Sequence, residues 1–159
     1  MESKKLVIFQ ANLEEYGVSV EYVVSIEKLD KVTPIPDMPN YMKGLMKVRD
    51  ELIPVLDTRQ ILFHDQTELT DKSRVIVVQT TEVSAALLVE DAKEILDVQK
   101  DTIKPLSLIA ANGSNYISGM VNLDKRLIAV IDPGKLVNGL LEIGDIKEEM
   151  QKQLAEVSE

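Results

Sequence analysis

The sequence contains no cysteine or tryptophan, one histidine, and seven glycines that never cluster. Without cysteine there are no disulfides, thiolate nucleophiles or zinc–thiolate centres. The isolated glycines provide no loop that could cradle a phosphate. His64 lies in a polar segment beside Asp65, where a lone histidine is far more often a solvated side chain than a base or a ligand. We therefore expect no cofactor and no metal.

A long apolar run and a basic patch are also missing. No stretch approaches the ~20 apolar residues that span a bilayer, and the opening residues do not lead into a signal-peptide core. These absences predict a cytoplasmic protein with no direct membrane insertion. The net charge of −9 repels a phosphate backbone, and only six residues are Phe or Tyr. A nucleic-acid partner is therefore not expected.

What the chain does contain is an internal repeat. Residues 41–62 recur 75 positions later, and the identical positions are Tyr41 and Tyr116, Gly44 and Gly119, Leu52 and Leu127, Ile53 and Ile128, Val55 and Val130, and Asp57 and Asp132. Upstream, residues 5–33 match residues 74–102 at an offset of 69. The change of offset falls after Thr102, where 108–115 is a plausible loop. A repeat longer than 50 residues that occurs only twice indicates duplicated half-domains rather than a solenoid.

Each copy has the pattern of short β-strands followed by a short helix. The halves are about 5–62 and 74–137, joined by a polar linker at 63–73. A half of roughly 60–70 residues builds only a marginal core, so we expect the two to share an interface within one domain at 1–140. Residues 141–159 have the three- and four-residue apolar spacing of an amphipathic helix.

The repeat places two carboxylates symmetrically, Asp57 and Asp132. Such a pair could serve as acid and base in an enzyme, but the favoured interpretation is that each caps the helix that follows it. A protein with strand edges, a duplicated core and no reaction chemistry is best suited to binding other proteins.

The ordered residues resemble the CheW-like domain over about 5–140. In the first half the resemblance rests on Val32-Thr-Pro-Ile-Pro36, Lys43-Gly44, Ile53-Pro-Val55 and Asp57-Thr-Arg59. In the second it rests on Leu88-Val-Glu-Asp91, Ile95-Leu96 and Tyr116-Ile-Ser-Gly119. The resemblance implies a mainly β fold of two five-stranded, SH3-like barrels packed side by side. We also expect that a strand near the N-terminus completes the opposite barrel.

The resemblance further implies a non-enzymatic adaptor that couples methyl-accepting chemoreceptors to the chemotaxis histidine kinase CheA, at receptor arrays on the inner face of the membrane. Two partners are expected, the regulatory domain of CheA and the cytoplasmic tip of a chemoreceptor. A structural array component that associates with itself is the alternative to this adaptor.

Two sets of site residues follow. The receptor groove is expected at Tyr22, Ser25, Ile26, Arg49, Lys93 and Ile95. The family usually has a glutamate at the position of Ser25. Two interpretations of Arg49 follow: it reaches across the groove to Glu27 or Asp50, or it is a solvated arginine of its turn. The kinase-facing surface is expected at the exposed members, provisionally including Met46, of the set Gly44, Met46, Val48 and Leu52.

Overall fold

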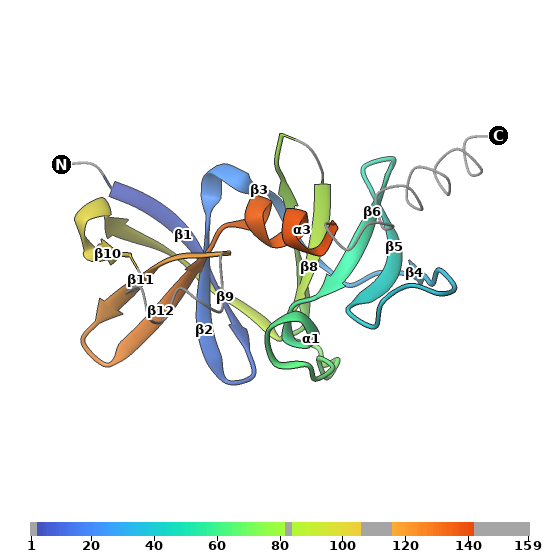
Figure 1. Ribbon diagram of the computed structural model, residues 1–159, viewed down its shortest axis with the longest axis horizontal. Coiled ribbons are helices and arrows are strands. Elements are labelled where there is room, and N and C mark those ends of the chain that lie inside the picture. Colours follow the sequence, from blue (N-terminus) through green and yellow to red (C-terminus); the bar gives the residue numbers. More distant parts are fainter. Residues whose placement is uncertain (1–2, 82–83, 106–115, 142–159) are drawn as a thin grey trace.

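The computed structural model describes residues 3–81, 84–105 and 116–141, which form a mainly β structure (Figure 1). The strands are β1 (Ser3–Ala11), β2 (Glu14–Ser19), β3 (Val23–Lys28), β4 (Val32–Thr33), β5 (Met42–Val48), β6 (Glu51–Asp57), β7 (Arg74–Gln79), β8 (Ser84–Val89), β9 (Asp91–Gln99), β10 (Ile103–Lys104), β11 (Ile117–Leu123) and β12 (Arg126–Ile131). The helices are α1 (Thr58–Phe63) and α3 (Pro133–Leu141), with 3₁₀ turns at η1 (Val20–Tyr22) and η2 (Lys100–Thr102). The expected loop at 108–115, and the expected C-terminal helix beyond Leu141, lie outside the described residues.

The strands form two six-stranded sheets. One has the order β3-β7-β8-β6-β5-β4 and the other β10-β11-β12-β2-β1-β9. In the first sheet the two edge strands are joined by only four residue steps, from Lys28 to Val32, which reach at most ~15 Å. Six flat strands would separate their edges by ~24 Å. The sheet must therefore curl round, and the same reasoning applies to the second sheet, whose edges are joined through η2.

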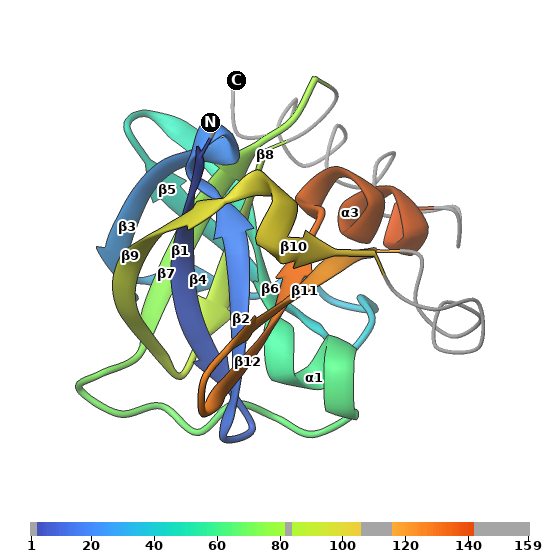
Figure 2. The same cartoon turned by 90° about the vertical axis from the view of Figure 1, so that its left-hand side faces the viewer.

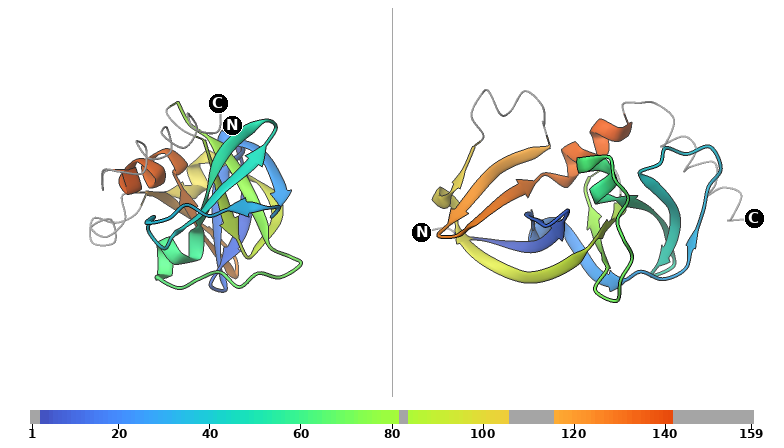
Figure 3. Two further views of the ribbon diagram at one scale, coloured as in Figure 1. Left: turned by 90° about the vertical axis from the view of Figure 1, so that its right-hand side faces the viewer. Right: turned by 90° about the horizontal axis from the view of Figure 1, so that it is seen from below.

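We call these curled sheets the central barrel (β3 to β8) and the terminal barrel (β1, β2 and β9 to β12). They lie side by side, with α1 and α3 at their junction (Figure 3). The predicted mainly β fold with two similar subdomains is confirmed. Each sheet has six strands rather than five because a two-residue strand, β4 or β10, adds to its edge.

The barrels do not coincide with the sequence halves 5–62 and 74–137. The first hairpin of each repeat joins the other repeat's strands: β1-β2 lies against β9 and β12, and β7-β8 lies against β3 and β6. The expected exchange at the N-terminus thus involves a whole hairpin from each repeat. As a result the central barrel is continuous in sequence, whereas the terminal barrel combines both ends of the described chain.

The exchanged hairpins have apolar residues on both faces because both faces are buried. In β1, Leu6 and Ile8 point into the terminal barrel, whereas Val7 and Phe9 belong to a core shared by the two barrels. β7 repeats the pattern, with alternate residues in the central barrel and in the shared core. Helix residues Phe63, Leu136 and Val137 pack on the same shared core. This core joins the two barrels.

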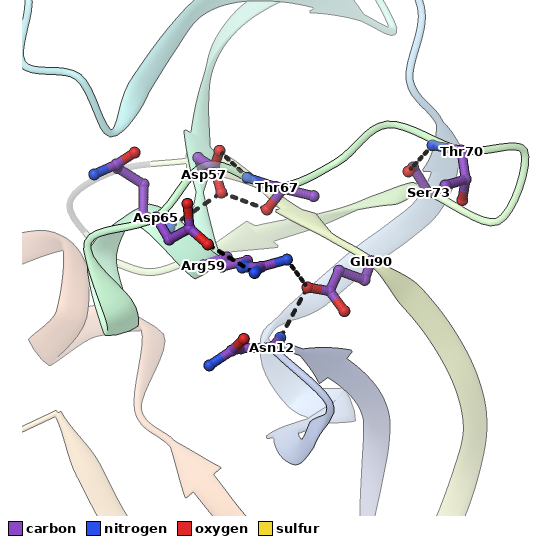
Figure 4. Close-up of polar contacts among 9 residues, drawn as sticks. Asn12, Asp57, Arg59, Asp65, Thr67, Thr70, Ser73 and Glu90 are labelled. Atoms are coloured by element: carbon purple, nitrogen blue, oxygen red, sulfur yellow. Dashed lines mark hydrogen bonds and ion pairs between the residues drawn. The ribbon is translucent and has the colours of Figure 1, made fainter.

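A polar bridge also connects the barrels. Glu90, in the link between β8 and β9, accepts a hydrogen bond from Arg59 Nη1 of α1 at 3.0 Å. The same carboxylate oxygen accepts from the backbone N–H of Asn12, in the β1–β2 turn, at 2.8 Å (Figure 4). Arg59 Nη2 reaches Asp65 at 2.7 Å. Arg59 therefore contacts the linker at 63–73, which we call the connector, through Asp65. Through Glu90 it is also linked to the β1–β2 turn of the terminal barrel.

Tyr16 is the titratable group that the shared core perturbs most clearly. Its ring stacks on Phe9 with centroids 5.7 Å apart and meets Phe63 edge-on at 6.4 Å. Burial, with smaller effects from Glu14 and Tyr116, raises the pKa of Tyr16 from 10.0 to about 12. Because the folded state favours the neutral phenol, this contribution to stability is fully present below pH 10 and is lost as the pH rises through 12.

We expect Tyr16 ionisation to remove up to about 3 kcal/mol of the free energy of unfolding between pH 10 and 12. Urea unfolding of the wild type and Tyr16→Phe across pH 8–12 isolates this group, since other titrating residues are common to both chains. The wild type should lose stability more steeply. Parallel pH profiles for the two chains would show that Tyr16 ionises equally well in the folded and unfolded states.

Candidate functional site: a pocket between the two barrels

The edge strands β3 and β9 carry equivalent β-bulges. In β3 the pairing with β7 skips Val24, and in β9 the pairing with β1 skips Lys93. These two residues are related by the repeat offset of 69. A bulge turns the extra side chain away from the regular alternation of the strand. Both edge strands therefore present an extra side chain, Val24 or Lys93, at equivalent positions of the repeat.

Exposed apolar residues lie beside both bulges. Ile26, two residues after the β3 bulge, is 40% exposed, and its counterpart Ile95 on β9 is 60% exposed. Both line a pocket of about 150 Å³, which we call the inter-barrel pocket; its full lining is Val7, Ile26, Arg74, Ala92, Lys93, Glu94 and Ile95. β1, β3, β7 and β9, which supply it, run side by side in Figure 2. The structure thus brings together Ile26, Lys93 and Ile95 of the predicted receptor groove.

Arg126 lies outside the pocket lining but binds Glu94, the acidic residue of that lining. Its Nη1 lies 2.8 Å from Glu94 Oε1, and its Nη2 lies 2.6 Å from Glu15 Oε2. Hydrogen bonds from Arg126 to these two carboxylates raise its pKa further above the ordinary value. Arg74 Nη1 donates to the backbone carbonyls of Asp71 and Ser73 at 2.8 and 2.7 Å. Those carbonyls orient the Arg74 guanidinium without neutralising it.

Tyr22 and Ser25 lie on the same segment but outside this pocket. Tyr22 lines a neighbouring pocket of about 310 Å³ together with Val24 and Gln79. Burial, then the nearby charges of Glu21 and Asp132, raise the pKa of Tyr22. Ser25 Oγ donates to Glu27 Oε2 at 2.7 Å. Val24, next to Ser25, extends the exposed apolar strip of β3 toward Tyr22.

Arg49 is exposed in the two-residue turn between β5 and β6, where Arg49 and Asp50 both have positive φ, 49° and 70°. This is the geometry of a type I′ hairpin turn. The expected pairing of Arg49 with Glu27 or Asp50 is wrong within the described residues: Glu27 accepts from Ser25, and Asp50 lies 3.9 Å from Lys47. Arg49 does not line the inter-barrel pocket.

The ion pair of Glu94 with Arg126 is a contact at the candidate site that sequence reasoning missed. Glu94 occupies in the second repeat the position of Ser25 in the first, 69 residues earlier. The glutamate that the resemblance led us to seek beside Arg49 is thus present in the other barrel. Applying the repeat offset of 69 to Ser25 would have identified Glu94.

Most of the predicted kinase-facing residues are interior. Met46 and Val48 are 2% and 4% exposed and pack inside the central barrel, so the provisional assignment of Met46 to the surface is wrong. The strand alternates, and it is Lys47 between them that faces outward. Gly44 is also buried, while Leu52 is half-buried at the margin of the shared core. Its repeat counterpart Leu127 is 59% exposed.

The two symmetric carboxylates each cap a helix on a different barrel. Asp57 accepts from the backbone N–H of Gln60 at 3.2 Å, and Asp132 accepts from that of Lys135 at 3.1 Å. Asp57 is fully buried and also accepts from the backbone N–H and the hydroxyl of Thr67 (Figure 4). Both aspartates are therefore engaged as helix caps, which was the favoured interpretation from the sequence.

Metal binding and membrane crossing also bear on function. No group of three or more His, Asp or Glu side chains in 3–81, 84–105 and 116–141 is arranged to hold a metal ion. Within the same residues, no helix combines the length and apolar character needed to cross a membrane.

Known proteins match the chain over most of its length. The CheW-like domain family matches residues 5–140. "Chemotaxis protein CheW" of Bacillus subtilis is 28% identical over 136 residues, covering 85% of this chain and 87% of that protein. The protein of the same name from Klebsiella aerogenes is 25% identical, covering 85% and 82%. The crystal structure of the scaffolding protein TtCheW from Thermoanaerobacter tengcongensis superposes with a TM-score of 0.77 at 25% identity, covering 86% of this chain and 88% of that one.

The fold and the inter-barrel pocket define a protein of two β-barrels that exchange hairpins, with a pocket at their junction. The chain belongs to the CheW-like domain family.

Proposed function

We propose that this chain is a non-enzymatic adaptor that binds the cytoplasmic tip of a methyl-accepting chemoreceptor in the inter-barrel pocket and holds the regulatory domain of CheA on a separate surface. The observation that carries the proposal is the paired exposure of Ile26 and Ile95 at equivalent bulged edges. Membership of the CheW-like domain family supports the same function. The chain would act in the cytoplasm, at receptor arrays on the inner face of the membrane.

The receptor side uses a helix-in-groove mode of recognition. Two apolar side chains on facing strand edges offer a contact for the apolar face of a helix. Val24 and Tyr22 continue the β3 wall beyond Ile26. The other wall is provided by β9, through Ile95 and Lys93.

The kinase side uses the outer end of the central barrel. Gly44, Met46 and Val48 are buried there, so they support the surface from inside rather than contact the partner. Leu52, at the margin of the core, and Lys47 and Arg49 of the hairpin remain available. An apolar residue beside a charged turn gives the small, reversible interface expected of a transient assembly.

The pocket gives a direct test with two equivalent variants. Ile26→Asp and Ile95→Asp should each weaken binding of a chemoreceptor cytoplasmic fragment by roughly tenfold to a hundredfold, since each places a charge where an apolar contact is needed. Calorimetric titration gives the dissociation constants. Melting curves should change little, because both side chains are substantially exposed.

Leu69→Asp is the matched control. Leu69 is exposed to a similar degree, at 62%, but lies in the connector between α1 and β7. The control should bind the receptor fragment as the wild type does. Equal loss of binding in all three variants, or no loss in the two pocket variants, would remove the inter-barrel pocket from the receptor interface.

A further inference from the structure

The two walls of the inter-barrel pocket are equivalent by the repeat but differ in charge, because β9 contributes Lys93 and Glu94 to the lining. The isoleucines match, Ile26 against Ile95, whereas the bulge residues do not: Lys93 of β9 lines the pocket, and its counterpart Val24 of β3 lies outside the lining. A purely apolar groove would be served by an apolar residue at both bulges. The repeat itself therefore does not require the charge that Lys93 adds to the pocket.

Lys93 is available to a partner. Its side chain is exposed, and it makes no ion pair within the described residues. The adjacent carboxylate, Glu94, is bound by Arg126 at 2.8 Å, and Arg126 is bound in turn by Glu15. The acidic residue of the pocket lining is thus already engaged with Arg126.

The charge around the pocket is locally positive in an acidic protein. Arg74 adds a second cation to the pocket lining, with its Nη1 directed to backbone carbonyls. The full chain carries a net charge of −9. An acidic partner side chain is repelled by most of this surface and attracted at the pocket, which favours one position for it.

The pocket has the size of a single side chain. Its volume of about 150 Å³ is below the ~300–1,000 Å³ typical of small-molecule sites. A carboxylate side chain from a docked helix fits this scale, with the isoleucines contacting apolar residues on either side of it. Lysine suits such a contact because its flexible stem places a compact charge without a fixed geometry.

We propose that Lys93 is a specificity-determining residue that selects an acidic side chain flanked by apolar residues on the docked receptor helix. This inference rests on the proposed function. Arg126 is a positioning residue in this arrangement, because by engaging Glu94 it keeps that carboxylate from competing with the partner's acid for Lys93.

The test is titration of a chemoreceptor cytoplasmic fragment against charge variants of the full chain. Lys93→Gln should weaken binding roughly tenfold, the scale of one charge-assisted contact, and Lys93→Glu should weaken it further. Glu94→Gln should bind at least as tightly as the wild type, since it removes a negative charge and releases Arg126. Lys125→Gln, an exposed lysine in the β11–β12 turn, is the matched control and should bind like the wild type.

Two added readouts separate charge recognition from a structural effect. Raising the salt concentration should shrink the difference between wild type and Lys93→Gln, because screening weakens a charge contact. Replacing the acidic residues of the receptor fragment by Gln, one at a time, should reveal one substitution that weakens wild-type binding but adds little to Lys93→Gln. Melting curves confirm that each variant is folded.

The outcomes distinguish this inference from the proposed function. A wild-type chain that does not bind the receptor fragment contradicts the proposed function. If the wild type binds but Lys93→Gln binds equally well, or if Glu94→Gln weakens binding as much as Lys93→Gln, charge selection at Lys93 is overturned while the receptor site stands.

Discussion

Asp57→Ala should lower the free energy of unfolding by about 3–5 kcal/mol, the cost of breaking a buried, hydrogen-bonded charge network. Asp132→Ala, at the equivalent position of the second repeat, should cost only about 1 kcal/mol, the usual value of a helix cap. The two aspartates have the same backbone setting, because each N–H donates to a tyrosine carbonyl, Tyr41 or Tyr116, at 2.7 Å. The difference between the two losses of unfolding free energy therefore reports the additional side-chain contacts of Asp57.

The larger cost follows from the partners of Asp57. Besides capping α1 through Gln60, its carboxylate accepts from the Thr67 backbone N–H at 3.0 Å and from the Thr67 hydroxyl, and lies 3.5 Å from Lys43 Nζ. Thr67 is 4% exposed, so removing the carboxylate leaves buried donors without a partner. Asp132 is half-buried and accepts only from the backbone N–H of Lys135 among the described contacts.

Urea unfolding of the wild type and both alanine variants provides the comparison. Thr67→Val serves as a third chain, and it should reproduce part of the Asp57→Ala effect because it removes one of the same contacts. Equal destabilisation by the two aspartate substitutions would mean that the contacts of Asp57 with Thr67 of the connector do not stabilise the fold in solution.

Gly44→Ala should destabilise the chain by about 2–6 kcal/mol, and more than Gly119→Ala does. Gly44 has φ +141°, a conformation that only glycine adopts readily, which costs other residues about 1–3 kcal/mol. An added Cβ would also overlap the backbone carbonyl of Thr33, and relieving such an overlap costs a further 1–3 kcal/mol or so. The displaced residue belongs to β4, which completes the edge of the central barrel.

Gly119 is the matched position because it faces β10 as Gly44 faces β4. The overlaps of an alanine there are less severe: an added Cβ would lie 2.8 Å from Ile103 Cγ2 and 2.9 Å from the Lys104 oxygen, with no positive φ. Thermal or urea unfolding of Gly44→Ala and Gly119→Ala measures both costs. A larger loss for Gly119→Ala would contradict the strain assigned to Gly44. Because Gly44 is structural, kinase binding should be probed at Leu52 rather than at Gly44.

The repeat in the sequence predicted much of this architecture. The offset of 75 identified Asp57 and Asp132 as caps and Gly44 and Gly119 as equivalent positions. These roles depend on local backbone geometry that both copies share. The connector contact was not predictable: Thr67 lies ten residues beyond Asp57 in a segment with no repeat counterpart. Only the folded chain shows that this segment returns to the carboxylate.

The exchange of hairpins and the burial of Met46 show where sequence reasoning ends. Repeat matching relates β1 to β7 but does not say which barrel each joins, since that depends on pairing between strands distant in sequence. Met46 resembled a surface residue because charges flank it. In a strand, however, alternate residues face opposite sides, so exposed Lys47 and buried Met46 are both consistent with the same segment.

Receptor-dependent capture of the kinase tests the central claim most directly. A chemoreceptor cytoplasmic fragment is immobilised, and the regulatory domain of CheA is applied with the wild-type chain, with Ile95→Asp, or with neither. Adaptor function predicts that the kinase domain is retained only with the wild-type chain, while Ile95→Asp still binds the kinase domain in solution. Kinase retention that is independent of the chain, or a chain that associates only with itself, would contradict the account.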